Sequence, residues 1–209
     1  MTSMVDGFFI VGSPRSGTTL LQLLLDAHPD VAIPPESHIY RVFTPLMPRY
    51  GDLSAEANLR RFADDLVADV WIKAWKLDVT GAELVREASR PGRAGVVDAL
   101  LRRYAAAHGA KRWGEKTPYH VSFLPQIMAD FPNARIIHLV RDGRDVLESR
   151  RRMVWGPKSA LGVARQWKQQ VDACRRFFTD RDDPRLMEVR YCDLVADASA
   201  QTMKLQRFL

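Results

Sequence analysis

Residues 12–19 read Gly-Ser-Pro-Arg-Ser-Gly-Thr-Thr, so that Gly12 and Gly17 bracket a short polar loop. An apolar run, residues 8–11, precedes this loop, and a leucine-rich amphipathic run, residues 20–25, follows it. A strand, a glycine-bracketed loop and a helix in this order are typical of a phosphate-binding loop, because backbone N–H groups point inward beside a helix N-terminus. The segment therefore predicts a site for a phosphate or sulfate group. The alternative is an ordinary turn whose Ser and Thr side chains cap the helix.

The residues after the second glycine distinguish this loop from that of ordinary nucleotide triphosphatases. Thr18 and Thr19 stand where such enzymes carry a lysine followed by a serine or threonine. The lysine that would reach the β- and γ-phosphates is therefore missing, and a cation, Arg15, lies within the loop instead. This pattern argues against ATP or GTP hydrolysis and favours a different anionic group.

The composition suits one globular domain. The chain has 209 residues, of which 46% are hydrophobic and 27% charged, enough for a sizeable core. No apolar run approaches the roughly 20 residues of a membrane span, and the first expected strand begins too early for a signal peptide. We therefore expect no transmembrane segment and a cytoplasmic location. The two cysteines and five histidines show no metal-ligand spacing, so we expect no metal.

The chain is basic, with a net charge of +6, and the excess of Lys and Arg lies entirely in residues 111–209. Such an excess can mark an anionic partner or simply the outer faces of helices. The chain has no Gly/Arg-rich tail and no basic-aromatic repeat, so we expect no nucleic-acid partner.

Expected strands and helices alternate along the chain. Strands are expected at 8–11, 135–140 and 185–191, the second of them from its branched apolar residues, and an extended segment is expected at 31–33. Helices are expected at 17–27, 54–69, 82–88, 96–108, 122–130, 145–153, 161–179 and 198–209, with irregular structure at 41–53 and a loop at 113–118. This order predicts an α/β fold, a P-loop-like three-layer α/β/α arrangement with a central parallel sheet. Ligands of such sheets bind at the carboxyl ends of the strands.

A second candidate anion site follows the strand at 135–140. Arg141 leaves this strand directly into a turn, and Ser149 lies about two helical turns further on. An arginine offers a planar fork of donors suited to phosphate oxygens, so this pair could hold one phosphate from two sides. The alternative is that Arg141 pairs with Asp142 or Asp145 at the start of the helix.

These motifs, in this order, resemble those of the sulfotransferase family. Val11–Leu20 is similar to the family's 5′-phosphosulfate loop, and Phe131–Arg144 with Ser149 is similar to its 3′-phosphate motif. In form they are most similar to those of tyrosylprotein sulfotransferases and their bacterial relatives. The resemblance covers residues 8–40 and 113–209, and the further elements that fit this branch are Asp26–Asp30, Pro35–Ser37 and Arg190–Val195.

The resemblance implies a sulfuryl donor, 3′-phosphoadenosine-5′-phosphosulfate (PAPS), with 3′-phosphoadenosine-5′-phosphate (PAP) as its product. It implies transfer of the sulfuryl group to a hydroxyl or amine acceptor. By position, Arg141 and Ser149 would hold the 3′-phosphate, while Lys116 would lie near the sulfuryl group and Glu36 would act as general base. The residues that would hold the 5′-phosphosulfate are Pro14, Arg15, Ser16, Gly17, Thr18 and Thr19.

The chemistry of sulfuryl transfer calls for the same residue types. It is an in-line displacement in which charge develops on the leaving phosphate oxygen, and cations such as Arg15 and Lys116 stabilise that charge. The acceptor must also lose a proton, which a positioned carboxylate such as Glu36 accelerates by roughly 10²–10⁴-fold. No metal is required, because sulfate carries less charge than phosphate. We therefore assign Glu36, Arg15 and Lys116 as candidate catalytic residues.

These assignments have alternatives. His38 is a rival to Glu36 as the base, because other sulfotransferases use histidine. Glu36 could instead be a surface carboxylate, and His38 a plain loop residue. Lys116 could be a solvated lysine. Three tryptophans, Trp71, Trp75 and Trp113, could line an acceptor pocket or pack in the core, and Arg150–Arg152 could form a solvated helix face or bind an acidic acceptor.

The predictions together describe a single sulfotransferase-like domain, residues 1–209, in which residues 41–112 form a helical region on the substrate side. Family members usually continue with a further C-terminal segment, which we expect this domain to lack. The expected acceptor is a small molecule, a glycan, a lipid or a peptide. The alternatives to a sulfotransferase are a non-catalytic nucleotide-binding module and an atypical P-loop small-molecule kinase.

Overall fold

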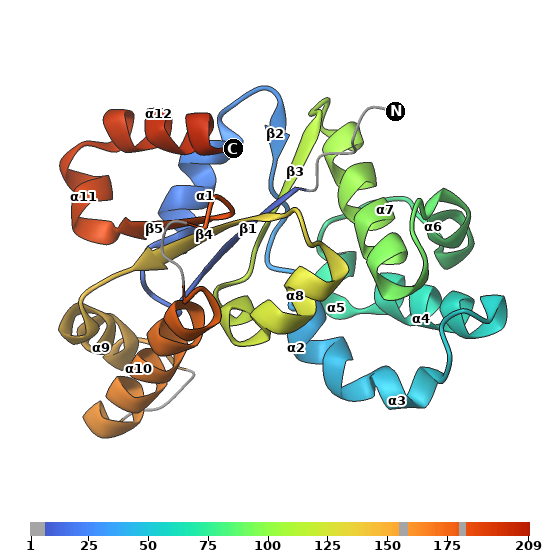
Figure 1. Ribbon diagram of the computed structural model, residues 1–209, viewed down its shortest axis with the longest axis horizontal. Helices are drawn as coiled ribbons and strands as arrows, with labels where there is room; N and C mark the ends of the chain where they lie inside the picture. The colour runs from blue at the N-terminus through green and yellow to red at the C-terminus, as the bar shows by residue number, and fades with distance from the viewer. Residues whose placement is uncertain (1–6, 155–158, 180–182) are drawn as a thin grey trace.

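A computed structural model describes residues 7–154, 159–179 and 183–209 (Figure 1). Within these residues, five strands form a sheet in the order β2-β3-β1-β4-β5, and all neighbouring strands run parallel. The fold is therefore a parallel α/β fold, as predicted. The strands are β1 (Phe8–Gly12), β2 (Val31–Ala32), β3 (Arg112–Lys116), β4 (Arg135–Val140) and β5 (Leu186–Arg190).

Helices connect the strands and cover the sheet. The longer ones are α1 (Thr18–Asp26), α4 (Glu56–Ala68), α7 (Gly92–Ala107), α9 (Gly143–Arg151), α10 (Ala160–Phe177) and α12 (Ala198–Phe208). The shorter ones are α2 (Ile39–Phe43), α3 (Met47–Tyr50), α5 (Val70–Lys73), α6 (Gly81–Glu87), α8 (Leu124–Asp130) and α11 (Tyr191–Ala196), with 3-10 turns η1 (Thr44–Leu46) and η2 (Pro118–Phe123).

Strand β1 lies in the middle of the sheet and is buried on both faces. Because side chains alternate along a strand, Phe9 and Val11 face one core and Phe8 and Ile10 face the other. Helices α1, α11 and α12 contribute to the second core, and the helices from α2 to α8 with α10 cover the first (Figure 1). These layers confirm the predicted three-layer arrangement.

Two local predictions are wrong. Residues 113–118 were expected to form a loop, but Arg112–Lys116 is β3, which pairs with β1 and β2. Its charged residues concealed a strand whose Glu115 and Lys116 are both buried. Residues 41–53 were expected to be irregular, but they contain the end of α2, η1 and α3, because their prolines lie in the first turns of short helices, where no donor is lost.

The carboxyl ends of three adjacent strands, β3, β1 and β4, therefore lie at the same edge of the sheet. They lead into Thr117, Ser13 and Arg141 respectively.

Among the described residues, no helix combines the length and the apolar composition needed to cross a bilayer.

Candidate functional site

The loop after β1 has the backbone of an anion cradle. The N–H group of Ser16 donates to the carbonyl of Ser13 at 3.0 Å, and α1 begins immediately after Gly17. Arg15 and Gly17 have positive φ values of 76° and 98°, and for Arg15 this left-handed conformation costs roughly 1–2 kcal/mol. Gly12 admits no side chain, because a Cβ atom there would lie 2.5 Å from the Leu139 carbonyl oxygen.

The hydroxyl groups of Ser13 and Ser16 point to a ligand that the loop is built to hold. Both side chains are buried, and neither hydroxyl has a hydrogen-bond partner within the described residues. A buried hydroxyl without a partner costs roughly 1–3 kcal/mol. A phosphate or sulfate oxygen would satisfy such groups, so the loop fits the anion that the sequence predicts.

The second predicted anion site lies directly beside this loop. The Arg15 Nε atom donates to Ser149 Oγ at 3.0 Å, and the Arg141 guanidinium donates to the Arg15 carbonyl at 3.5 Å. The Arg141 guanidinium also lies 4.3 Å above the Tyr191 ring. The predicted alternative holds in part, since Arg141 Nε lies 3.4 Å from the Asp145 carboxylate.

Two pockets meet at these arginines. The larger has a volume of about 950 Å³, and the smaller about 310 Å³. Arg15 and Arg141 line both pockets. Of the other predicted site residues, Ser149 lines the smaller pocket, Ser16 and Lys116 line neither, and those that line the larger pocket are Pro14, Gly17, Thr18, Thr19 and Glu36.

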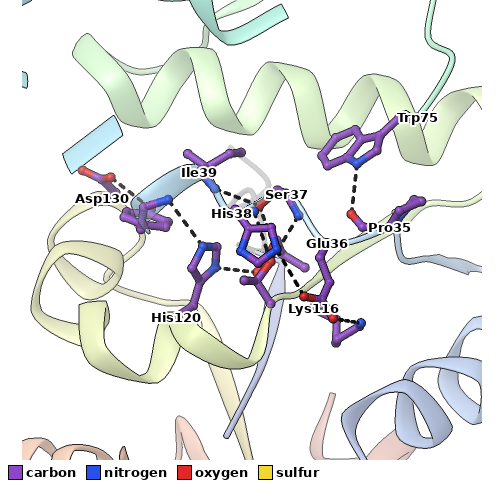
Figure 2. A network of polar contacts seen from close by, with 12 residues as sticks. Pro35, Glu36, Ser37, His38, Ile39, Trp75, Lys116, His120 and Asp130 are labelled. Atoms are coloured by element: carbon purple, nitrogen blue, oxygen red, sulfur yellow. Dashed lines mark hydrogen bonds and ion pairs between the residues drawn. The ribbon is translucent and has the colours of Figure 1, made fainter. Parts of the chain in front are cut away.

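The three candidate residues for proton transfer and charge stabilisation are in contact. Lys116 Nζ lies 2.6 Å from Glu36 Oε1, and His38 Nε2 lies 3.4 Å from Glu36 Oε2 (Figure 2). Burial lowers the pKa of His38, and the neighbouring Glu36 carboxylate offsets this only in part, so the imidazole is neutral at pH 7. Glu36 and His38 both line the larger pocket, whereas the Lys116 side chain is only 5% exposed.

The tryptophans take different roles. Trp75 and Trp113 are buried in the core, as one of the two alternatives predicted. Trp71 is 45% exposed, lines the larger pocket and packs against His38 with the ring centroids 4.3 Å apart. Trp75 still supports the site, because its indole N–H donates to the Pro35 carbonyl at 2.9 Å, one residue before Glu36 (Figure 2).

The structure adds residues that the sequence did not single out for this site. Arg41 and Tyr119 line the larger pocket, with the Arg41 guanidinium 4.9 Å above the Tyr119 ring. Tyr191 packs against Gly17, so that a Cβ atom at Gly17 would lie 2.4 Å from its ring. The only signal for Tyr191 was its place in the Arg190–Val195 motif.

The predicted solvated face at Arg150–Arg152 is wrong for one of its members. Arg151 and Arg152 are exposed, but Arg150 is 1% exposed and donates to Gln166 Oε1 at 2.7 Å. Helix α10 packs over α9 at this point and covers the Arg150 side chain. Arg152 lines the smaller pocket together with Arg15 and Arg141.

A parallel sheet with an anion cradle after one strand and a second cationic pocket after its neighbour is typical of P-loop-like α/β proteins that bind phosphorylated ligands. A family model described as the sulfotransferase family matches residues 7–209. The chain therefore belongs to the sulfotransferase family.

The curated relatives are protein-tyrosine sulfotransferases. The chain is 32% identical over 144 residues to a putative protein-tyrosine sulfotransferase of Caenorhabditis briggsae, covering 68% of this chain and 41% of that protein. It is 28% identical over 214 residues to the protein-tyrosine sulfotransferase of Drosophila melanogaster, covering 96% of this chain and 37% of that protein. The chain thus spans less than half the length of these two relatives.

Solved structures support the fold. The sulfotransferase domain from the curacin biosynthetic pathway matches with a TM-score of 0.64 and 24% identity, over 97% of this chain and 73% of that one. The sulfotransferase domain from the Synechococcus PCC 7002 olefin synthase matches with a TM-score of 0.63 and 24% identity, over 97% and 72% of the two chains. At this identity the similarity establishes the architecture.

Proposed function

We propose that the protein transfers the sulfuryl group of PAPS to a hydroxyl or amine acceptor. Membership of the sulfotransferase family supports this activity. The structural observation that carries it is the contact between two anion pockets through Arg15, whose side chain bonds to Ser149 and whose carbonyl accepts from Arg141. Such a pair of pockets suits a nucleotide with phosphate groups at both its 5′ and its 3′ positions.

The residues that would hold PAPS divide between the pockets. The loop from Pro14 to Thr19 would bind the 5′-phosphosulfate, and the unpartnered hydroxyls of Ser13 and Ser16 fit an anion there. Arg141 and Ser149 would bind the 3′-phosphate. When bound, PAPS supplies an activated sulfuryl group and a phosphate that leaves.

The protein's own residues would handle the proton and the developing charge. Glu36 lines the larger pocket and can accept the proton of the acceptor group. Lys116 and Arg15 can stabilise negative charge as it develops. Lys116 lies 2.6 Å from Glu36, so its charge acts next to the proposed base.

The choice between Glu36 and His38 as base is testable. We expect Glu36→Gln to lower kcat by roughly 10²–10⁴-fold, because an amide cannot accept the proton. We expect His38→Asn to lower kcat much less, because on this proposal His38 only contacts the Glu36 carboxylate and does not accept the proton itself. Steady-state kinetics at saturating PAPS measures both, and the reverse order of losses would make His38 the base.

The larger pocket also offers an acceptor surface. Leu20, Trp71, Tyr119 and Arg41 line it, which suits an acceptor with an aromatic or apolar body. Small molecules, glycans, lipids and peptides all remain candidates. Because the curated relatives are protein-tyrosine sulfotransferases, tyrosine-containing peptides are the first acceptors to test.

The proposal predicts that the protein binds PAP in preference to ATP. PAP is expected to raise the melting temperature of the protein, and ATP to raise it far less, because only PAP carries a phosphate for each pocket. Incubation with PAPS and a panel of acceptors, followed by mass spectrometry, should then show a product heavier by one sulfuryl group. Equal stabilisation by both nucleotides contradicts the proposal, PAP binding without any product favours a non-catalytic module, and phosphate release from ATP favours a kinase.

A further inference from the structure

A buried polar cluster adjoins the segment that carries Glu36 and His38, and two of its members, Ser37 and His120, are labelled in Figure 2. It consists of Ser37, Glu115, Thr117 and His120, and we call it the Glu115 cluster. Glu115 is 1% exposed and His120 is fully buried. A carboxylate in such a place is costly unless hydrogen bonds satisfy it. None of these four residues lines either pocket, so the proposed chemistry does not use them directly.

The Glu115 carboxylate is well satisfied. Its Oε1 atom accepts from Ser37 Oγ at 2.7 Å and from Thr117 Oγ1 at 2.6 Å, and its Oε2 atom lies 2.8 Å from His120 Nδ1. Burial alone would raise the pKa of Glu115, but the neighbouring His120 and the hydrogen bonds from Thr117 and Ser37 outweigh it and lower the pKa. The group is therefore ionised and acts purely as an acceptor.

The ring of His120 is oriented from its other side. The backbone N–H of Tyr40 points at His120 Nε2 at 3.4 Å, so Nε2 must accept. With Nε2 accepting, Nδ1 carries the proton that is donated to Glu115. All three partners of the carboxylate are thus donors.

This arrangement decides what the two hydroxyls can do. Because each hydroxyl gives its single proton to Glu115, its lone pairs are left to accept from the backbone. Thr117 Oγ1 accepts from the N–H groups of Ser37 at 3.1 Å and His38 at 3.3 Å. Ser37 Oγ accepts from the N–H group of Ile39 at 3.3 Å.

The backbone fixed in this way is the segment that carries the candidate base. Three consecutive N–H groups, from Ser37 to Ile39, are bound just after Glu36. His38 has a φ of 52°, a left-handed conformation that costs roughly 1–2 kcal/mol and needs such support. Lys116, the next residue of β3, holds the Glu36 side chain itself.

We propose that Glu115 is a positioning residue, whose buried carboxylate orients the Ser37 and Thr117 hydroxyls and thereby fixes the backbone that presents Glu36 and His38 to the pocket. The inference rests on the proposed sulfuryl transfer for its kinetic consequence, but its structural consequence can be measured without turnover. The nucleotide loop is held by other contacts, so Glu115 should affect the acceptor step and leave nucleotide binding unchanged.

The test is Glu115→Gln, which keeps the size of the side chain but puts an N–H donor where an acceptor is needed. We expect kcat to fall by roughly 10- to 100-fold, the cost of a misplaced catalytic group. The dissociation constant of PAP should stay the same. Hydrogen exchange of the Ser37 and His38 amides should speed up at least about tenfold, whereas exchange in β1 and β4 should change little.

Glu188→Gln is the matched control. Glu188 is also a carboxylate bonded to a histidine, His138, at 3.2 Å, but it lies on β5, at the opposite edge of the sheet from β2. Its loss should lower stability and leave kcat and the exchange of the Ser37 and His38 amides unchanged. Ser37→Ala removes one hydroxyl of the Glu115 cluster and leaves the carboxylate in place, so it should show the same changes as Glu115→Gln in weaker form. It provides the test if Glu115→Gln fails to fold.

The outcomes separate the two proposals. Unchanged kcat and unchanged exchange in Glu115→Gln overturn the role of Glu115. A joint loss of PAP affinity, stability and kcat, with faster exchange throughout the sheet, also overturns it, because that is a general structural defect. If the wild-type protein binds PAP but sulfates no acceptor, the proposed function fails, and the exchange of the Ser37 and His38 amides then decides the role of Glu115 alone.

Discussion

Arg141 lines both pockets and packs over the Tyr191 ring. Its guanidinium contacts the Arg15 carbonyl and the Tyr191 ring. We expect Arg141→Ala to weaken PAP binding by roughly 10- to 100-fold, because hydrogen bonds to a charged group contribute about 1.5–3 kcal/mol. Calorimetric titration measures the loss.

Arg144→Ala is the control for Arg141. Arg144 lies three residues further on, its side chain is 91% exposed, and it pairs with Asp142 instead of facing a pocket. This change should leave PAP affinity unchanged. Equal losses in the two variants would mean that Arg141 acts only through general positive charge.

Both the backbone conformation at Gly17 and the lack of space beside it favour glycine. The φ of Gly17 is 98°, and a Cβ atom would lie 2.4 Å from the Tyr191 ring. At Gly109 only the backbone conformation favours glycine, since its φ is 71° and nothing lies within 4 Å of its Cβ position. We expect Gly109→Ala to lower the free energy of unfolding by about 1–2 kcal/mol. Gly17→Ala should lower it further and abolish PAP binding; urea denaturation measures both, and equal losses would contradict the steric argument.

At the scale of elements, α5 supplies one wall of the larger pocket. Trp71 packs on His38 and lines the pocket, whereas its neighbour Val70 is 71% exposed and does not. We expect Trp71→Ala to lower kcat/KM for the acceptor by roughly tenfold, about 1.4 kcal/mol and within the range of an aromatic contact, with PAP affinity unchanged. Val70→Ala should change neither quantity. A loss of PAP affinity in Trp71→Ala would place the tryptophan on the nucleotide side.

Strand β3 shows where sequence reasoning failed at this scale. Strands 8–11 and 135–140 were predictable because branched apolar residues fill them, and the glycine loop and Arg141 followed from them. Arg112–Lys116 has a tryptophan but no branched residue, and its charged side chains are stabilised by partners from distant segments, Ser37 and Glu36. Only the packing of the whole chain shows that these partners exist, so the strand and the Glu115 cluster could not be predicted from spacing.

Contacts between distant segments also determine which charged residues of the whole molecule are buried, and the sequence alone does not show these contacts. The alternation of strands and helices was enough for the parallel three-layer fold, and the placement of the glycine loop after β1 and of Arg141 after β4 followed from the sequence. Arg150 could not be predicted as buried, because its cover comes from α10 through Gln166. Charge patterns alone cannot tell such a residue from its exposed neighbours Arg151 and Arg152.

The stability of the whole molecule should depend on acid. The hydrogen bond from His138 and the pairing with Arg175 hold the pKa of Glu188 at about 2, although burial opposes them. The unfolded chain, with an ordinary glutamate pKa of about 4.3, then takes up this proton first, so the free energy of unfolding falls as the pH drops from about 5 to about 2. The Glu115 carboxyl acts in the same direction.

Glu188→Gln tests this acid dependence. The variant should be less stable than the wild type near neutral pH and should lose less stability over the acid range, because one of the linked carboxylates is gone. Urea denaturation at a series of pH values measures both slopes. Identical slopes in the two proteins would show that Glu188 is not linked to folding.

The bond between Arg15 and Ser149 has a consequence for how a nucleotide would arrive. It ties the segment after β1 to the helix after β4 through the protein's own side chains. Because the protein itself joins these two segments, little conformational entropy would be lost in bringing them together around an incoming nucleotide. Association should then proceed in a single kinetic phase that depends linearly on nucleotide concentration, as in rigid docking.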